Sequence, residues 1–248
     1  MQRVPTAVDH QTSIAPTKRA RRVPRKLHGY FIAFTLLFAG IVLTGFSRTF
    51  FIPVARGTFA KPLIVHVHGA FFFAWTAVLV VQAFLAATKR LRAHRRVGSI
   101  AGWLVLPMLV LGTIVAKRDT VNDFREGGGD AVLTFFYGEL ADLAMFGLLA
   151  GGAMLMRNKP DYHKRWVILG SLGLMGAAVG RIPEVSAAGL CIFIAMIASV
   201  AVYDIASRRA VHTATVMGAA VLLLLGLTEE RIGNSKIWLS AAHQLLKV

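Results

Sequence analysis

The sequence contains a single cysteine, Cys191, among 248 residues. One cysteine excludes an internal disulfide, and the chain has no cysteine cluster for zinc or iron–sulfur binding. Because Cys191 lies inside an apolar run, we expect an unreactive thiol. The HExxH motif and the glycine-rich phosphate loop are also missing, so the sequence carries no signature of a zinc protease or a nucleotide-binding enzyme.

Acidic residues are scarce as well: 12 Asp and Glu stand against 28 Lys and Arg, which gives a formal net charge of +16. The positive charge is concentrated in the N-terminal tail and in residues 88–96, 157–165 and 207–209, which are alternate connections between apolar runs. Lys and Arg keep such connections in the cytoplasm. The pattern therefore predicts a cytoplasmic N-terminus and attraction to anionic lipid at the cytoplasmic face, with no nucleic-acid partner.

Long stretches of the chain have almost no charge at all. Hydrophobic residues make up 56% of the sequence and the mean hydropathy is +0.61, and apolar runs of about 18 residues or more are typical of membrane-spanning helices. The chain therefore predicts an all-α integral membrane protein with seven transmembrane helices, a cytoplasmic N-terminus and a periplasmic C-terminus. The seven runs are residues 29–47, 63–87, 97–116, 132–156, 166–183, 187–206 and 211–227.

Three regions follow from this pattern. Residues 1–27 are basic and lack apolar periodicity, which predicts a disordered cytoplasmic tail. Residues 28–227 form the membrane domain. Residues 228–248 form a periplasmic tail, in which the spacing of apolar residues favours a short amphipathic helix on the membrane surface.

The second apolar run, residues 63–87, carries polar groups that are costly to bury in lipid. His66 and His68 lie near its start, and His68, Trp75 and Gln82 follow one another at intervals of seven. This spacing places the last three on one helical face. A polar stripe of this kind faces a protein interior or a wet cavity, where it either forms a site or holds helices together by hydrogen bonds.

Ionisable residues also occur in the fourth and fifth runs. Glu139 and Asp142 share one face of a helix, and a rise of 1.5 Å per residue brings Asp142 level with Arg181 of the next helix. We therefore predict an Asp142–Arg181 ion pair. Glu139 falls near the depth of His66 and His68, so these three residues are candidate metal ligands near the periplasmic boundary.

Histidines also occur at the predicted cytoplasmic ends of the helices. His94 and His163 share the context H-[RK]-R followed by apolar residues and glycine, which suggests a repeated hairpin; His28 and His212 occupy similar positions. Imidazole is a common ligand of haem and of transition metals. His94 and His163 are therefore candidate cofactor ligands, although histidine beside Lys and Arg at a membrane interface also needs no further explanation.

The combined pattern resembles a family of bacterial inner-membrane proteins that are themselves uncharacterised. The resemblance covers about residues 45–185. It rests on HxHG in "HVHGAFFFAW", HRxxG in "HRRVG", PxxHKR in "PDYHKRW" and RxP in "GRIP". It implies a multi-pass protein of the bacterial inner membrane and brings no assigned activity. Histidines at the helix ends are more distantly similar to b-type cytochromes, which usually place their paired histidines deeper in facing helices.

The leading interpretation is a protein that binds a metal or haem and has a redox or assembly role. His66, His68 and Glu139 would be the outer ligands. His94 and His163 would be the inner ligands. The sequence does not decide whether the protein is an enzyme or which cofactor, if any, it holds.

Two alternatives stay open. The first is a proton-coupled transporter or permease that uses Glu139, Asp142 and Arg181 as relay groups. The second is a scaffold subunit, in which the polar groups only join helices and the partner is another membrane protein or a second copy of the chain.

Overall fold

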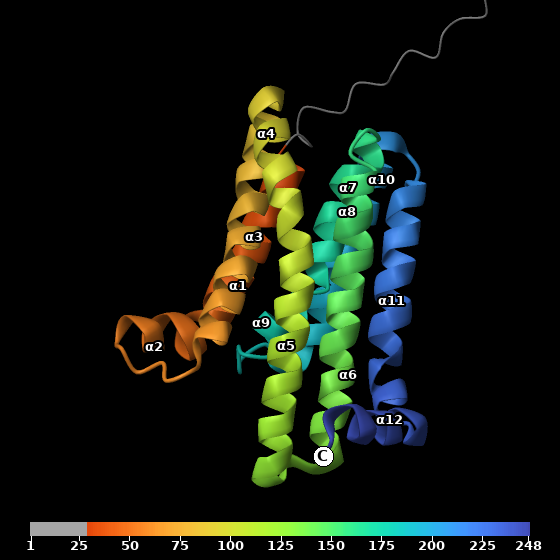
Figure 1. The fold of residues 1–248 in the computed structure, drawn as a ribbon. Helices are drawn as coiled ribbons and strands as arrows, with labels where there is room; N and C mark the ends of the chain where they lie inside the picture. Colours follow the sequence, from red (N-terminus) through yellow and green to blue (C-terminus); the bar gives the residue numbers. More distant parts are fainter. Residues whose placement is uncertain (1–28) are drawn as a thin grey trace, which may run out of the picture.

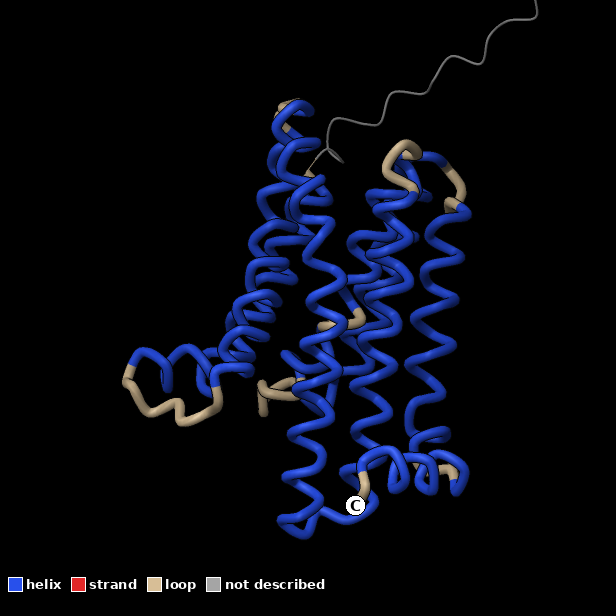
Figure 2. The backbone as a smooth tube through the Cα atoms, viewed as in Figure 1, coloured by secondary structure: helices blue, strands red, loops and turns tan. Residues whose placement is uncertain are grey.

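A computed structural model describes residues 29–248, so the tail predicted over residues 1–27 lies outside the described residues. The described part is entirely helical and contains no strand (Figure 2). Its α-helices are α1 Tyr30–Phe46, α2 Ile52–Ala55, α3 Leu63–Ala87, α4 Leu91–Ala101, α5 Val105–Asp123, α6 Gly129–Phe146, α7 Gly152–Leu155, α8 Pro160–Leu172, α9 Met175–Val179, α10 Gly189–Arg208, α11 Thr213–Gly233 and α12 Lys236–Leu246. Short π-helical or 3₁₀ turns lie between several of them, at Ser47–Phe51, Gly102–Leu104, Phe124–Gly128, Gly147–Gly151 and Ser186–Ala188.

Five helical stretches in the described residues are long and apolar enough to cross a membrane, which makes this a multi-pass membrane protein. They are Tyr30–Ala55, Leu63–Ala87, Leu91–Leu155, Ser186–Arg208 and Thr213–Gly233.

The third stretch is 65 residues long and folds back on itself. Gly127 and Gly129 have φ angles of 98° and 58°, a region that glycine enters without a steric penalty. The chain reverses there, and α5 and α6 lie side by side (Figure 1).

The region predicted as the fifth span is shorter and interrupted. The helix breaks at Gly173 and Leu174 between α8 and α9, and α9 ends at Val179. Neither piece reaches the length of a crossing by itself, so the count of seven spans stays a prediction. The last long helix, α11, continues six residues beyond the predicted end at residue 227.

The three basic connections predicted to share one side do lie at one end of the bundle, at the top of Figure 1. They join α3 to α4, α7 to α8, and α10 to α11; we call this the basic end. At the opposite end, α12 lies across the bundle (Figure 1). It covers the stretch for which the sequence favours an amphipathic helix, and its place on a membrane surface stays a prediction. Its buried residues are Ala242 and Leu246, whereas Leu245 is exposed.

Large apolar side chains occur both inside and outside this bundle. The core joins α1, α3, α6, α8 and α11 through fully or nearly fully buried residues such as Phe38, Trp75, Phe146, Leu169 and Leu222. Many Leu, Ile and Val side chains point outward and are exposed. An exterior this apolar is unsuited to water and is what a lipid-facing bundle requires.

Candidate functional site

Two histidines at the basic end bond back across their own hairpins in the same way. His94, in the first turn of α4, lies 3.3 Å through Nδ1 from the carbonyl oxygen of Gln82 on α3. His163, in the first turn of α8, lies 2.8 Å through Nδ1 from the carbonyl oxygen of Ala153 on α7. A carbonyl only accepts, so Nδ1 carries the proton in both rings. This shared bond supports the repeated hairpin that the H-[RK]-R motif suggested.

The two hairpins bring these histidines together. The ring centroids of His94 and His163 are 6.3 Å apart and the ring planes are nearly perpendicular, although 69 positions separate the residues in sequence. Because each Nδ1 donates to a carbonyl, each neutral ring keeps a lone pair on Nε2 for a ligand. Histidines that bind metals usually donate their other ring N–H to such an acceptor. Both rings are partly buried.

Gln82 adds a second bond to the first hairpin. Its Nε2 donates to the His94 carbonyl at 3.1 Å, so the two residues are joined in both directions. Trp75, one heptad earlier, donates from Nε1 to the Ser171 hydroxyl on α8 at 3.1 Å. The polar stripe of α3 therefore faces the protein interior, and at these two positions it joins helices by hydrogen bonds.

His212, the other described histidine at the basic end, has a different role. It caps α11, and its Nδ1 accepts a bond from the Ala214 backbone N–H at 3.0 Å. Burial, then the charges of Arg165 and Arg208, lower the pKa of His212. The nitrogen that is protonated in His94 and His163 is thus the acceptor in His212.

The predicted outer metal ligands do not meet in the structure. The His66 ring packs edge-on against Phe59, with centroids 5.0 Å apart, and the His68 ring lies against Phe72 at 4.3 Å. The reason is that α3 is a regular helix from Leu63, so side chains two positions apart diverge. In residues 29–248, no group of three or more His, Cys, Asp or Glu is arranged to hold a metal ion.

The predicted Asp142–Arg181 ion pair is also not formed. Arg181 donates to the carbonyl of Ala177, one turn back, and lies over the Phe46 ring at 4.7 Å. The depth calculation assumed a straight helix through Arg181, but α9 ends at Val179 and Arg181 lies in the loop that follows. Asp142 instead faces Gly176 of α9.

Sequence reasoning missed a buried ion pair beneath the second hairpin. Arg165 donates from Nε to both carboxylate oxygens of Asp204 on α10, at 2.9 and 3.2 Å, and from Nη2 as well. Neither side chain has any exposed surface. Asp204 also accepts from the Thr215 hydroxyl and the His212 backbone N–H. The available signal was Asp204 itself, since it is the only acid in the run 187–206.

The same network continues to the surface through Asp161. Its carboxylate pairs with Arg208 and with Lys164, the latter at 3.1 Å. Burial raises the pKa of Asp161, but the hydrogen bonds from Arg208 and Lys164 outweigh it, so the pKa lies well below its usual range. Lys164 and Arg165 of the second hairpin are therefore paired with carboxylates, whereas Arg157 and Lys159 at its tip are exposed.

A third acidic residue lies close to Glu139 and Asp142, on the helix that packs against α6. Glu229 of α11 lies against Gly138 of α6, one residue from Glu139 and one turn from Asp142. It was missed because the predicted last span ended at residue 227. Within the described chain, none of these three carboxylates makes a side-chain hydrogen bond or an ion pair.

No family model, curated protein or solved structure matches this chain. The resemblance based on the HxHG, HRxxG, PxxHKR and RxP motifs therefore stays a prediction.

Proposed function

We propose that this chain crosses a bacterial inner membrane seven times and binds one haem through His94 and His163 at its cytoplasmic end. The observation that carries the proposal is the meeting of these two rings, each with Nδ1 bonded to a backbone carbonyl.

The seven crossings are α1, α3, α4 with α5, α6 with α7, α8 with α9, α10 and α11. The reversal at Gly127–Gly129 divides Leu91–Leu155 into two of them. From Pro160 to Val179, α8 and α9 together extend at most about 30 Å at 1.5 Å per residue, which is comparable to the thickness of the hydrocarbon core; the first turn of α8, with Asp161, lies at the cytoplasmic headgroups. The positive charge of the basic end supports a cytoplasmic location for that end.

The separation of the rings fits a shared metal. Two imidazoles that bind one metal from opposite sides through Nε2 would have centroids roughly 6 Å apart when each metal–nitrogen bond is about 2.0–2.1 Å, and the observed separation is 6.3 Å. The helices α4 and α8 make few close backbone contacts with each other.

The number of ligands favours haem over a bare ion. A structural zinc site needs four protein ligands, and the described residues offer no third His, Cys, Asp or Glu in such a group. A porphyrin supplies four nitrogens itself and needs only axial ligands. His94 and His163 would hold the haem, which would supply single-electron transfer. The Gln82 and Ala153 carbonyls orient the two imidazoles and raise the basicity of Nε2.

Absorbance of the purified protein tests the proposal. The protein is produced with added haem, solubilised in detergent and compared with the double variant His94→Ala/His163→Ala. We expect a Soret band in the parent, its loss in the double variant, and an unchanged band in His212→Ala, because His212 lies at the same end but serves as a helix cap. An absent band in the parent, or an undiminished band in the double variant, would overturn the proposal.

A second candidate, proton-coupled transport, is favoured by Glu139, Asp142 and Glu229. Carboxylates without partners inside a membrane bundle are typical of proton pathways. Proteoliposomes with an imposed pH gradient test this function, with Asp142→Asn as the variant and Asp161→Asn, at the basic end, as the control. Substrate uptake or proton flux that Asp142→Asn does not reduce would exclude it.

A further inference from the structure

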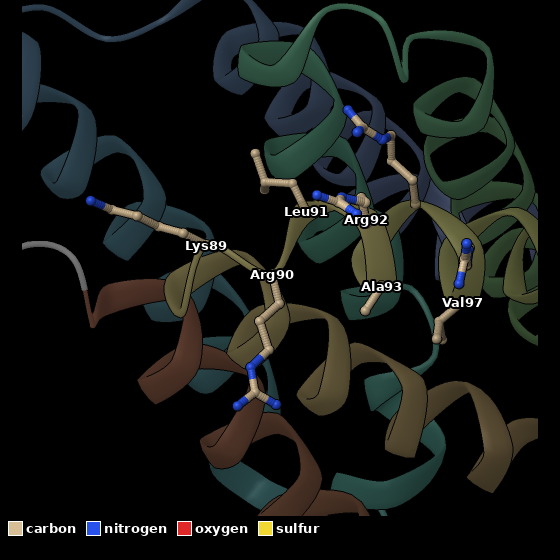
Figure 3. Close-up of a pocket in the computed structure, with 8 residues that line it drawn as sticks. Lys89, Arg90, Leu91, Arg92, Ala93 and Val97 are labelled. Atoms are coloured by element: carbon tan, nitrogen blue, oxygen red, sulfur yellow. The ribbon is translucent and has the colours of Figure 1, made fainter.

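A strongly positive surface lies at the tip of the first hairpin, where α3 turns into α4. It surrounds a shallow hollow of about 700 Å³ (Figure 3). The hollow is lined by Lys89, Arg90, Leu91, Arg92, Ala93, Arg95, Arg96 and Val97. The five cationic side chains belong to exposed residues, and among residues 29–248 none of them has a carboxylate within 4.0 Å.

These cations do not converge on one point. Figure 3 shows Lys89 and Arg90 directed away from each other and away from Arg92. A single small anion would therefore contact only part of the set. His94 does not line the hollow and faces His163, so this surface is separate from the proposed haem site.

An uncovered apolar stripe continues from the cations along α4 and α5. Steps of three and four residues, which keep one face of a helix, lead from Arg92 and Arg96 to Ile100 and Trp103. Ile100 is 73% exposed and Trp103 is 77% exposed. The stripe ends with Leu106, Val110 and Ile114, which are all exposed. A soluble anion would gain nothing from this stripe, whereas a lipid can use both parts.

We propose that this face of the first hairpin is a binding site for an anionic phospholipid. Its phosphodiester headgroup lies against Arg92 and Arg96, where Arg offers paired donors to phosphate oxygens. An acyl chain lies along Ile100 and Trp103. The site goes beyond the proposed haem binding and does not depend on it.

Trp103 provides the readout. Of the four tryptophans, Trp75 is buried, Trp166 and Trp238 are partly buried, and Trp103 is exposed. The full chain is reconstituted in phosphatidylcholine vesicles that contain a small fraction of lipid with brominated acyl chains, which quench tryptophan on contact. We expect brominated phosphatidylglycerol to quench more strongly than brominated phosphatidylcholine, and the difference to disappear in Trp103→Phe.

Charge variants then locate the headgroup. Arg92→Gln/Arg96→Gln should weaken the preference for phosphatidylglycerol by up to about 30-fold, since each cation near an anionic surface contributes about fivefold. The matched control is Arg157→Gln/Lys159→Gln, which removes two exposed cations at the same end that do not line the hollow. All four residues are exposed, so both variants should fold, and thermal unfolding checks that they do.

Three results would overturn the proposal. The first is equal quenching by both brominated lipids in the parent protein. The second is a loss in Arg92→Gln/Arg96→Gln no greater than in the control. The third is loss of the preference on addition of inorganic phosphate but not of chloride at equal ionic strength, which would identify a small-anion site in place of a lipid site.

Discussion

The two hairpins at the basic end share the motif H-[RK]-R, but the arginine of this motif is exposed in the first hairpin and buried in the second. Arg96 and Arg165 are both the third residue of H-[RK]-R, and the histidine before each bonds back to the preceding helix. Arg165 is fully buried against Asp204, whereas Arg96 is exposed and has no described acidic partner. The short motif thus determines the bond that the histidine makes, whereas the helix that packs against the hairpin determines whether the arginine is buried.

The physical reason lies in α10. This helix packs against α8 and places Asp204 beside the second hairpin at the basic end. A buried arginine without such a partner would be an uncompensated charge. The first hairpin lies at the edge of the bundle (Figure 1), so Arg96 stays exposed, and an exposed charge needs no buried partner.

The largest expected difference between the hairpins follows from this contrast. Arg165→Ala or Asp204→Ala should lower the free energy of unfolding by about 3–5 kcal/mol, because each leaves a buried charge unpaired. Arg96→Ala should change it by about 0.5 kcal/mol or less. Thermal unfolding in detergent measures all three.

Replacement of both partners sharpens this prediction. The double variant Arg165→Met/Asp204→Leu should recover part of the loss, since an apolar pair leaves no charge to compensate. A loss for Arg165→Ala no larger than for Arg96→Ala would contradict the account of the second hairpin.

The two hairpins should also differ in how well a glycine near each histidine tolerates substitution by alanine. A Cβ at Gly170 would come within 2.7 Å of the Ala150 backbone nitrogen and 2.9 Å of the Leu149 Cβ, and backbone gives way poorly. Gly170→Ala should therefore cost about 1–3 kcal/mol. A Cβ at Gly98 would meet only the Gln82 side chain, whose Nε2 would lie 2.6 Å away, and that side chain can move.

Gly98→Ala should consequently cost less than about 1 kcal/mol, because the weakened Gln82 bond is offset by the better helix propensity of alanine. Chemical denaturation of both variants compares the two positions. In a Gln82→Leu background, Gly98→Ala should add no further loss. Equal losses for Gly98→Ala and Gly170→Ala would show that both hairpins are packed with the same tightness.

The smallest expected effect is a pH dependence confined to the second hairpin. Because the pKa of Asp161 is lowered in the folded protein, its ion pairs stabilise the fold above the unfolded pKa of about 3.9, and this contribution is lost as the pH falls through the folded pKa. Asp161 is 39% exposed, so the effect should stay below about 1 kcal/mol.

The stability difference between the parent and Asp161→Asn should thus be largest near pH 7 and should narrow as the pH falls below about 4. Melting temperatures over that range measure it. A difference that widens in acid would have the wrong sign for a carboxylate with a lowered pKa.

The long helices could be predicted from the sequence because their signal is local. The second run, residues 63–87, has the same bounds as α3, and the first run differs from α1 by one residue at each end. The location of the basic connections at one end of the bundle could be predicted by counting the apolar runs between them, which needs no tertiary information.

The site could be predicted only where a repeated local context marked it. His94 and His163 were found through H-[RK]-R, whereas the Arg165–Asp204 pair depends on which helix packs against α8, and one sequence does not show this. The Asp142–Arg181 prediction failed because a depth calculation cannot detect that α9 ends before Arg181.

Coordination of haem by both histidines is the central claim, and spectroscopy of the single variants tests it most directly. The parent protein with haem should give the absorbance and resonance Raman spectra of six-coordinate, low-spin iron, since both axial positions are filled by imidazole. His94→Ala and His163→Ala should each give a five-coordinate, high-spin spectrum. A single variant that keeps the six-coordinate, low-spin spectrum would show that its histidine is not a ligand, and the proposed pairing would be wrong.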